Sequence, residues 1–265
     1  MMYGIVLEGG GGKGAYQFGA WKALNELGIE YNGVVGTSIG AINAALMVQD
    51  NFEAAGELWN KIHISASESI GTEIYHQLAA HEFKSKDPVE IKKEMQETFG
   101  IDGIDISTFR ESVNAMIKED IIRGSEKDFG MVTISLKQKK GLKLFKEDIP
   151  KGQLGDYMIA SCYLPIYKTM LLNGDYFLDG SYYDRLPTDM LIGKGYKKII
   201  EIRLYTPKPD EEKKNIPSDV HITTIYPKEY LGKALDFSKE QVLKNIKLGY
   251  ADTLETLSQV TERKI

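Results

Sequence analysis

The residue most clearly placed to act as a reactive group is Ser38, which lies in the segment Gly36-Thr37-Ser38-Ile39-Gly40. This G-x-S-x-G pattern surrounds nucleophilic serines, because the glycines permit a sharp turn between a strand and a helix and leave the hydroxyl exposed. The dipole of the following helix also favours a developing alkoxide. Serine is a common helix cap as well, so the pattern alone leaves a purely structural role open.

A run of four glycines, Gly9 to Gly12, is followed by Lys13 and Gly14 and stands between a predicted strand and a predicted helix. Unpaired backbone N–H groups at the start of a helix form a site for an anion. A Walker A phosphate loop is excluded, because Gly14 stands where that motif needs Ser or Thr. A dinucleotide-binding turn fits the glycine spacing, but the second strand lacks an acidic residue at its end. An oxyanion hole and a turn needed only for packing are the other two interpretations.

An acidic residue that could serve Ser38 as a base is Asp179, which ends the apolar segment Phe177-Leu178 and precedes Gly180. Aspartate has an ordinary pKa of about 3.9 and is a weak base at neutral pH, but burial raises that pKa. Direct contact with the serine hydroxyl would compensate for the remaining weakness. The structural alternative is a simple Asp-Gly turn.

A histidine could also serve as the base, and His221 is the only one in the predicted sheet-forming C-terminal part. The order Ser38, Asp179, His221 suits the triad of an α/β-hydrolase, which is therefore the alternative to a pair of Ser and Asp. In that fold, however, the serine follows several strands, whereas here it follows the second. His221 is expected instead to begin a strand.

The hydrophobic pattern predicts an α/β domain of two or three layers over residues 1–265. A strand at 3–8, a helix at 15–27, a strand at 31–35 and a helix from Ser38 imply parallel strands with right-handed crossovers. Residues 51–123 read as a helical insertion, with helices at 53–62, 88–99 and 108–122. Further strands are predicted at 129–136, 142–145, 167–172, 176–178, 198–204 and 221–226. Residues 206–219 read as an exposed loop, and a long helix is predicted in the C-terminal region 231–265, ending near residue 260.

Composition limits the classes of function and location. The chain has 265 residues, 42% hydrophobic and 27% charged, with a formal net charge of -5. An acidic chain without a basic block is not expected to bind nucleic acid. Its single cysteine, Cys162, excludes an intrachain disulfide and fits a reducing compartment. With no signal-peptide pattern and no apolar run of the roughly 18 residues that a span needs, a cytoplasmic location is expected.

Taken together, these segments resemble the patatin-like phospholipase family over residues 3–204. Residues 9–14, GGGGKG, resemble the family's G-G-G-x-R/K-G segment, residues 36–40 its G-x-S-x-G motif, and residues 179–181 its D-G-G/A motif. Residues 160–165, ASCYLP, resemble its A-S-x-A-x-P segment, and Leu186-Pro187 fits its N-x-P. Three positions depart from the family pattern: Ser181, Arg185 where Asn is usual, and the bulkier pair Cys162-Tyr163. These departures leave the reacting groups in place and put the substrate range in doubt.

The resemblance implies a three-layer α/β/α sandwich with a mostly parallel central sheet. It also implies a Ser38–Asp179 catalytic dyad, an oxyanion hole from the amides around Gly10, Gly11 and Gly12, and a positive charge from Lys13 nearby. The implied reaction is hydrolysis of a lipid or other acyl ester without metal or cofactor, with transient contact at a membrane surface. Oligomeric state is left open. The alternatives from other classes are a nucleotide-binding module and a non-catalytic lipid-binding domain.

Overall fold

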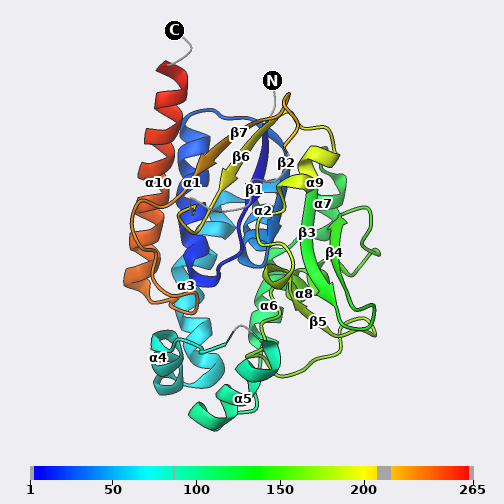
Figure 1. Ribbon diagram of the computed structural model, residues 1–265, viewed down its shortest axis with the longest axis vertical. Helices are drawn as coiled ribbons and strands as arrows, with labels where there is room; N and C mark the ends of the chain where they lie inside the picture. Colours follow the sequence, from blue (N-terminus) through cyan, green and yellow to red (C-terminus); the bar gives the residue numbers. More distant parts are fainter. Residues whose placement is uncertain (1–2, 86, 208–215, 263–265) are drawn as a thin grey trace.

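Ile5, Val6 and Leu7 are fully buried, so the first strand lies at the centre of a sheet that is covered on both faces. In this computed structural model, residues 3–85, 87–207 and 216–262 are described. Seven strands form one sheet, six of them in the order β4-β3-β2-β1-β6-β7, with β5 added to β3 (Figure 1). The strands are β1 (Tyr3–Leu7), β2 (Tyr31–Thr37), β3 (Asp128–Ser135), β4 (Lys140–Phe145), β5 (Phe177–Asp179), β6 (Lys198–Ile202) and β7 (His221–Ile225).

Helices cover the two faces of this sheet unequally. Ile5 and Leu7 point into a large cluster built with helices α1 (Ala15–Glu26), α2 (Ile39–Val48), α8 (Leu154–Ser161) and α10 (Lys239–Glu262). Val6 points the other way, into a smaller cluster with the short helix α9 (Thr188–Gly193). The neighbours β1, β2, β3, β6 and β7 run parallel, and only β4 and β5 are antiparallel to β3. The predicted mixed α/β fold with a mostly parallel sheet is therefore confirmed.

Strand β3 is long enough to pair with two strands along the same edge. Its first half pairs with β2, and the last of these pairs joins Val132 to Thr37. Its next residue, Thr133, pairs with Asp179 of the antiparallel strand β5. The ends of β2 and β5 therefore meet head-on, at successive positions of one strand, which brings residues 37 and 179 together.

The helical insertion forms five helices: α3 (Phe52–Ile70), α4 (Thr72–Ala80), α5 (Pro88–Phe99), α6 (Ser107–Met116) and α7 (Glu119–Gly124). Around α4 and α5 it has a small hydrophobic core of its own, which includes Leu78, Ile91 and Met95. In Figure 1 these two helices lie beyond the end of the sheet, below α3 and α6. We call this part of the insertion, residues 72–106, the cap.

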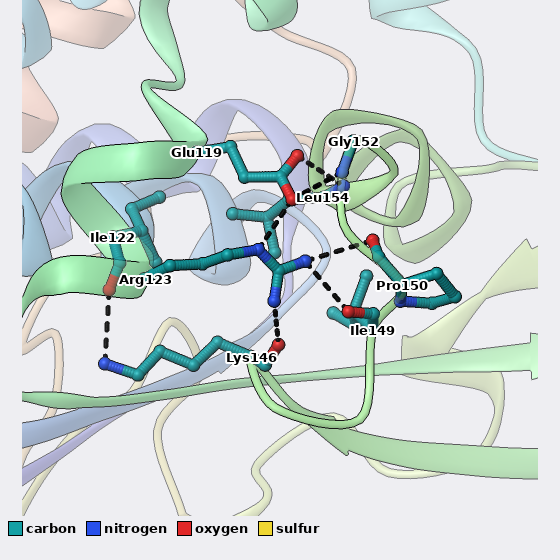
Figure 2. A network of polar contacts seen from close by, with 8 residues as sticks. All are labelled: Glu119, Ile122, Arg123, Lys146, Ile149, Pro150, Gly152 and Leu154. Carbon is teal, nitrogen blue, oxygen red and sulfur yellow. Dashed lines mark hydrogen bonds and ion pairs between the residues drawn. The ribbon is translucent and has the colours of Figure 1, made fainter.

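A polar network fastens the end of the insertion to the sheet and to α8 (Figure 2). The Arg123 guanidinium lies 2.6 Å from the Glu119 carboxylate. It also donates to the carbonyls of Lys146, Ile149 and Pro150 at 2.6 to 3.0 Å. Glu119 in turn accepts the N–H groups of Gly152 and Leu154. Because every charge has a partner here, the network holds the segment that leads into α8.

Three predicted elements are corrected by the structure. Residues 167–172 form no strand: only isolated bridges join Ile104 to Tyr167 and Leu172 to Asp175, and Ile166 packs into the cap. The helix predicted at 108–122 is broken between Met116 and Glu119 into α6 and α7. Helix α10 begins at Lys239, since Gly232 has a φ of +81° and the chain before Ser238 is irregular. Part of the predicted loop at 206–219, residues 208–215, lies outside the described residues.

Candidate active site

Ser38 stands on a sharp turn between β2 and α2. Its backbone has a φ of 56° and a ψ of −129°, a conformation that a residue with a side chain rarely adopts. The flanking glycines are required by space, because a Cβ on Gly36 would lie 2.3 Å from the Gly40 carbonyl oxygen. A Cβ on Gly40 would lie 2.5 Å from the Leu7 carbonyl oxygen. The turn is thus strained and tightly packed, as expected for a nucleophile elbow.

Asp179 is the hydrogen-bond partner of the Ser38 hydroxyl. Ser38 Oγ donates to Asp179 Oδ2 at 2.6 Å, and the Ser181 amide donates to Oδ1 at 2.7 Å. The Asp179 side chain is 1% exposed. Burial raises the pKa of this carboxyl above its ordinary value, while the hydrogen bonds from Ser38 and Ser181 and the charge of Arg185 oppose the rise. A carboxylate with few solvating contacts is a stronger base than a solvated one, so this pair can move a proton.

Ser161, at the end of α8, fixes the Ser38 backbone. The Ser38 amide donates to Ser161 Oγ at 2.9 Å, and that hydroxyl donates to the Val132 carbonyl at 2.7 Å. Ser161 is fully buried and so links the elbow to β3. The sequence suggests no role for this residue, although a serine at the end of an apolar helix is a usable signal that a buried partner exists.

The glycine turn lies beside this pair and forms the short 3-10 helix η1 (Gly11–Gly14). A Cβ on Gly9 would lie 3.4 Å from Ser38 Cβ, so the turn passes close to Ser38. The amide of Gly9 donates to the Arg185 carbonyl, and that of Gly12 donates to the Ala234 carbonyl at 2.7 Å. The amides of Gly10 and Gly11 donate to no described residue. The sequence places Gly12 among the expected donors, but its N–H is already engaged, which leaves Gly10 and Gly11 for a ligand.

Lys13 is buried behind the glycine turn, where its ammonium meets an aromatic ring. Its Nζ lies 3.8 Å from the centre of the Tyr205 ring, over which the Arg185 guanidinium carbon also lies, at 4.8 Å. Burial, helped by the nearby Arg185 charge, lowers the pKa of Lys13 to about 8, and the attraction of Glu8 opposes this shift. Glu8 is itself buried and accepts the amides of Leu204 and Tyr205. Lys13 thus brings positive charge close to the turn.

A cavity of about 120 Å³ opens beside Ser38. Gly11, Ser38, Ile39 and Cys162 line it where the glycine turn and the elbow lie. The rest of its wall is almost entirely apolar and comes from the insertion, from the chain after α8, and from residues that precede α10. The apolar residues among these are Ile62, Tyr75, Leu78, Ile104, Ile106, Phe109, Leu164, Ile166, Tyr167, Leu235 and Phe237. Burial raises the pKa of the Cys162 thiol, so this cysteine stays neutral within the wall.

His221 is not brought to this site. It is exposed and begins β7, where it pairs with Lys198 at the amino end of β6. Ser38 follows the carboxyl end of β2, which is level with Leu7 and Ile202. At least four strand residues separate the two levels, which is more than about 13 Å along the sheet. The Ser38-Asp179-His221 triad therefore has no geometric basis.

The described parts of the chain also lack the features of a metal site and of a membrane-spanning helix. Within residues 3–85, 87–207 and 216–262, no group of three or more His, Cys, Asp or Glu side chains is arranged to hold a metal ion. Nor does any helix in these ranges combine the length and the apolar character needed to cross a bilayer.

Comparisons with known proteins agree with this geometry. The chain is 27% identical over 202 residues to patatin-like phospholipase domain-containing protein 7 of Rattus norvegicus, covering 75% of this chain and 13% of that protein. It is 53% identical over 47 residues to lysophospholipase nte1 of Aspergillus terreus, covering 18% of this chain and 3% of that protein. The chain thus spans only a small part of these relatives.

Among solved structures, VipD from Legionella pneumophila has the same fold, with a TM-score of 0.60 at 14% identity. That match covers 97% of this chain and 67% of VipD. The model of the patatin-like phospholipase family matches residues 5–192, which include the glycine turn, Ser38 and Asp179. With most of the chain matched, and with all three motifs gathered at one edge of the sheet, the chain belongs to the patatin-like phospholipase family.

Proposed function

We propose that this protein is a serine acyl hydrolase that cleaves lipid esters with the Ser38–Asp179 pair. The observation that carries the proposal is the hydrogen bond of 2.6 Å from Ser38 Oγ to the buried Asp179 carboxylate. Membership of the patatin-like phospholipase family supports a lipid as the substrate, and the apolar cavity beside Ser38 is suited to an acyl chain.

In the first half of the proposed reaction, Ser38 Oγ attacks the ester carbonyl carbon and its proton passes to Asp179 Oδ2. The carbonyl oxygen becomes an oxyanion and accepts hydrogen bonds from the amides of Gly10 and Gly11, while Lys13 adds positive charge nearby. The bond from the carbonyl carbon to the alkoxy oxygen then breaks. The leaving alcohol takes the proton from Asp179, and the acyl group stays on Ser38.

In the second half, Asp179 accepts a proton from a water molecule as that water attacks the acyl-enzyme. A second oxyanion forms at the same amides and collapses. Ser38 leaves with the proton returned by Asp179, and the free fatty acid is released. Apart from the ester and one water molecule, the proposed cycle uses only groups of the chain, and the pair is restored at its end.

The proposed mechanism can be tested by removing the Ser38 hydroxyl. Ser38→Ala should abolish hydrolysis of p-nitrophenyl esters and of lysophospholipids, and labelling by a fluorophosphonate, which reacts with activated serines. The substitution removes one oxygen, so circular dichroism and the melting temperature should show a folded protein. Wild-type activity in this variant would overturn the mechanism. An unlabelled, inactive wild-type protein would favour the non-catalytic lipid-binding alternative instead.

We further propose brief contact with a lipid surface during catalysis. Tyr182, three residues after Asp179, is 37% exposed, and Tyr230, near Lys13, is 70% exposed. Tyrosines of this kind suit the boundary between water and lipid, because the ring is apolar and the hydroxyl is polar. Tyr230→Ser should weaken sedimentation with phospholipid vesicles while leaving hydrolysis of soluble esters unchanged. Equal sedimentation of both proteins would contradict the contact.

A further inference from the structure

One wall of the cavity is supplied by a segment that no sequence motif marks. Residues 231–238 are the last part of the link between β7 and α10 and form no helix or strand; we call them the strap. In Figure 1 the strap is the orange loop that enters α10 at the end nearest α3 and α4. The family model stops at residue 192, so the strap lies outside the part of the chain that the family defines.

The strap is pressed against the glycine turn by backbone contacts. Its Ala234 carbonyl accepts the Gly12 amide at 2.7 Å. A Cβ on Gly11 would lie 2.1 Å from the Ala234 carbonyl oxygen, and one on Gly12 would lie 2.3 Å from that of Asp236. The absence of side chains on the turn is therefore what allows the strap to come so close to Ser38.

On its other side the strap is tied to the cap. The Phe237 amide donates to the Tyr75 hydroxyl at 3.0 Å, and the Lys233 ammonium donates to the Ala80 carbonyl. Tyr75 lines the cavity together with Leu235 and Phe237 of the strap. Two segments separated by more than 150 residues thus close the same side of the cavity, and both are held in place by hydrogen bonds.

The size of the cavity limits what it can enclose. At about 120 Å³ it is somewhat smaller than an engineered apolar cavity of about 150 Å³ that binds benzene. By that comparison the cavity encloses no more than about six carbon atoms of an acyl chain. Leu235 and Phe237 of the strap line it, so a longer chain that stays in the cavity would press against them.

We infer that the strap determines which acyl chains the enzyme accepts, with Leu235 and Phe237 as the specificity-determining residues that favour short chains. The inference rests on the proposed ester hydrolysis at Ser38. It predicts that kcat/KM rises from p-nitrophenyl butyrate to the hexanoate and falls for the dodecanoate.

The decisive variant is Phe237→Ala, which removes the ring from the wall. The ratio of kcat/KM for the dodecanoate to that for the hexanoate should rise by about tenfold or more, since a pocket discriminates by at least that factor for a single misfit group. Phe145→Ala is the matched control, because Phe145 is equally half-buried but packs on the opposite face of the sheet. An unchanged ratio in Phe237→Ala, or an equal loss for all chain lengths, would overturn the inference.

A binding measurement separates this inference from the proposed reaction. The Ser38→Ala protein, which cannot react, is titrated by calorimetry with hexanamide and dodecanamide, with and without Phe237→Ala. The inference would be supported if hexanamide bound more tightly than dodecanamide and Phe237→Ala reversed this preference. That result would show that the strap limits the length of the bound chain, even if no ester were hydrolysed. Equal binding of both amides to both proteins would refute it even if ester hydrolysis were established.

Discussion

The Ser38 and Asp179 side chains meet although 141 residues separate them in sequence. Each is constrained by its own surroundings: Ser38 by a backbone conformation that glycines permit, Asp179 by burial and by the Ser181 amide. A carboxylate that hydrogen-bonds the nucleophile directly can accept its proton without an intervening imidazole. The energetic requirement is a raised carboxyl pKa, and burial supplies it.

Replacing Asp179 should show how strongly the rate depends on a carboxylate next to Ser38. Asp179→Asn keeps the shape of the side chain but cannot take the proton, so kcat should fall by at least about 100-fold. His221→Gln is the comparison, and it should leave kcat near the wild-type value because His221 begins β7 at the other end of the sheet. Steady-state kinetics on one p-nitrophenyl ester measures both. A small fall in kcat for Asp179→Asn together with a large fall for His221→Gln would favour the triad over the pair.

The same pKa predicts the acid side of the pH profile. Asp179 must be deprotonated to accept the serine proton, so kcat/KM should fall as the pH drops through the pKa of the buried carboxyl. Because burial raises this pKa, the midpoint should lie above the ordinary value of about 3.9. The profile of kcat/KM against pH on a soluble ester, restricted to pH values at which the protein stays folded, provides the measurement. A midpoint at or below the ordinary value would show that Asp179 is not the titrating base.

At the scale of elements, strand β3 acts as the common support of the site. It pairs with β2 up to Thr37 and with β5 from Asp179, and its Val132 carbonyl accepts the Ser161 hydroxyl. A Cβ on Gly180 would lie 2.2 Å from that same carbonyl oxygen, which explains the glycine after Asp179. Three parts of the site therefore depend on two residues in the middle of one strand.

This arrangement explains what the sequence can and cannot predict. The elbow at Ser38 and the strand ending at Asp179 carry local signals, namely flanking glycines and an apolar run, and both lie where they were expected. The partners of Ser161 and the place of the strap depend on contacts between distant segments, which a single sequence does not specify. The strand expected at 167–172 fails for the same reason: Tyr167 contacts the cap core and Leu172 belongs to the main cluster, but the segment makes only isolated bridges with other parts of the chain.

The glycine turn offers a prediction at this scale. Gly11→Val introduces a Cβ 2.1 Å from the Ala234 carbonyl oxygen at a residue with a φ of +58°, so the turn must shift and its free amide must move. Losing one oxyanion donor lowers kcat by roughly 100- to 1000-fold. The control is Gly28→Val, because Gly28 has a φ of +64° but no atom within 4 Å of an added Cβ.

Both variants should be measured as kcat per folded molecule, together with the melting temperature. Backbone strain lowers the stability of each, but only Gly11→Val should lower kcat. If the folded fraction of Gly11→Val were fully active, the glycine turn would serve packing alone.

At the scale of the whole molecule, the two ends of the chain are joined by the packing of α1 against α10, which Figure 1 shows side by side. The helices touch through glycines: a Cβ on Gly19 would lie 2.0 Å from the Ile246 carbonyl oxygen, and one on Gly249 1.9 Å from that of Tyr16. Buried Tyr16 also donates its hydroxyl to Asp252 at 3.0 Å. Because α10 follows the strap directly, this contact also fixes where the strap ends.

Gly249→Ala should therefore separate the two helices and lower the free energy of unfolding by about 1 to 3 kcal/mol, the usual cost of overpacking. Gly56→Ala in α3 is the control: its added Cβ would meet only Phe18 at 3.6 Å, and alanine favours a helix over glycine by about 1 kcal/mol. Urea unfolding of both variants measures the difference. Destabilisation of the same size in both would mean that the close helix contact is not the cause.

The position of the strap has a consequence for the order in which the protein matures during synthesis. Chains emerge from the ribosome amino end first, and Ser38 and Asp179 are made long before residues 231–262. The glycine turn remains uncovered and the cavity lacks a wall until the last of these residues leaves the exit tunnel and α10 docks on α1. A chain halted before residue 231 would contain Ser38 and Asp179 but would lack the strap residues that line the cavity. The chain-length selectivity that we infer for the strap would therefore be acquired only after the two proposed reactive residues have been made.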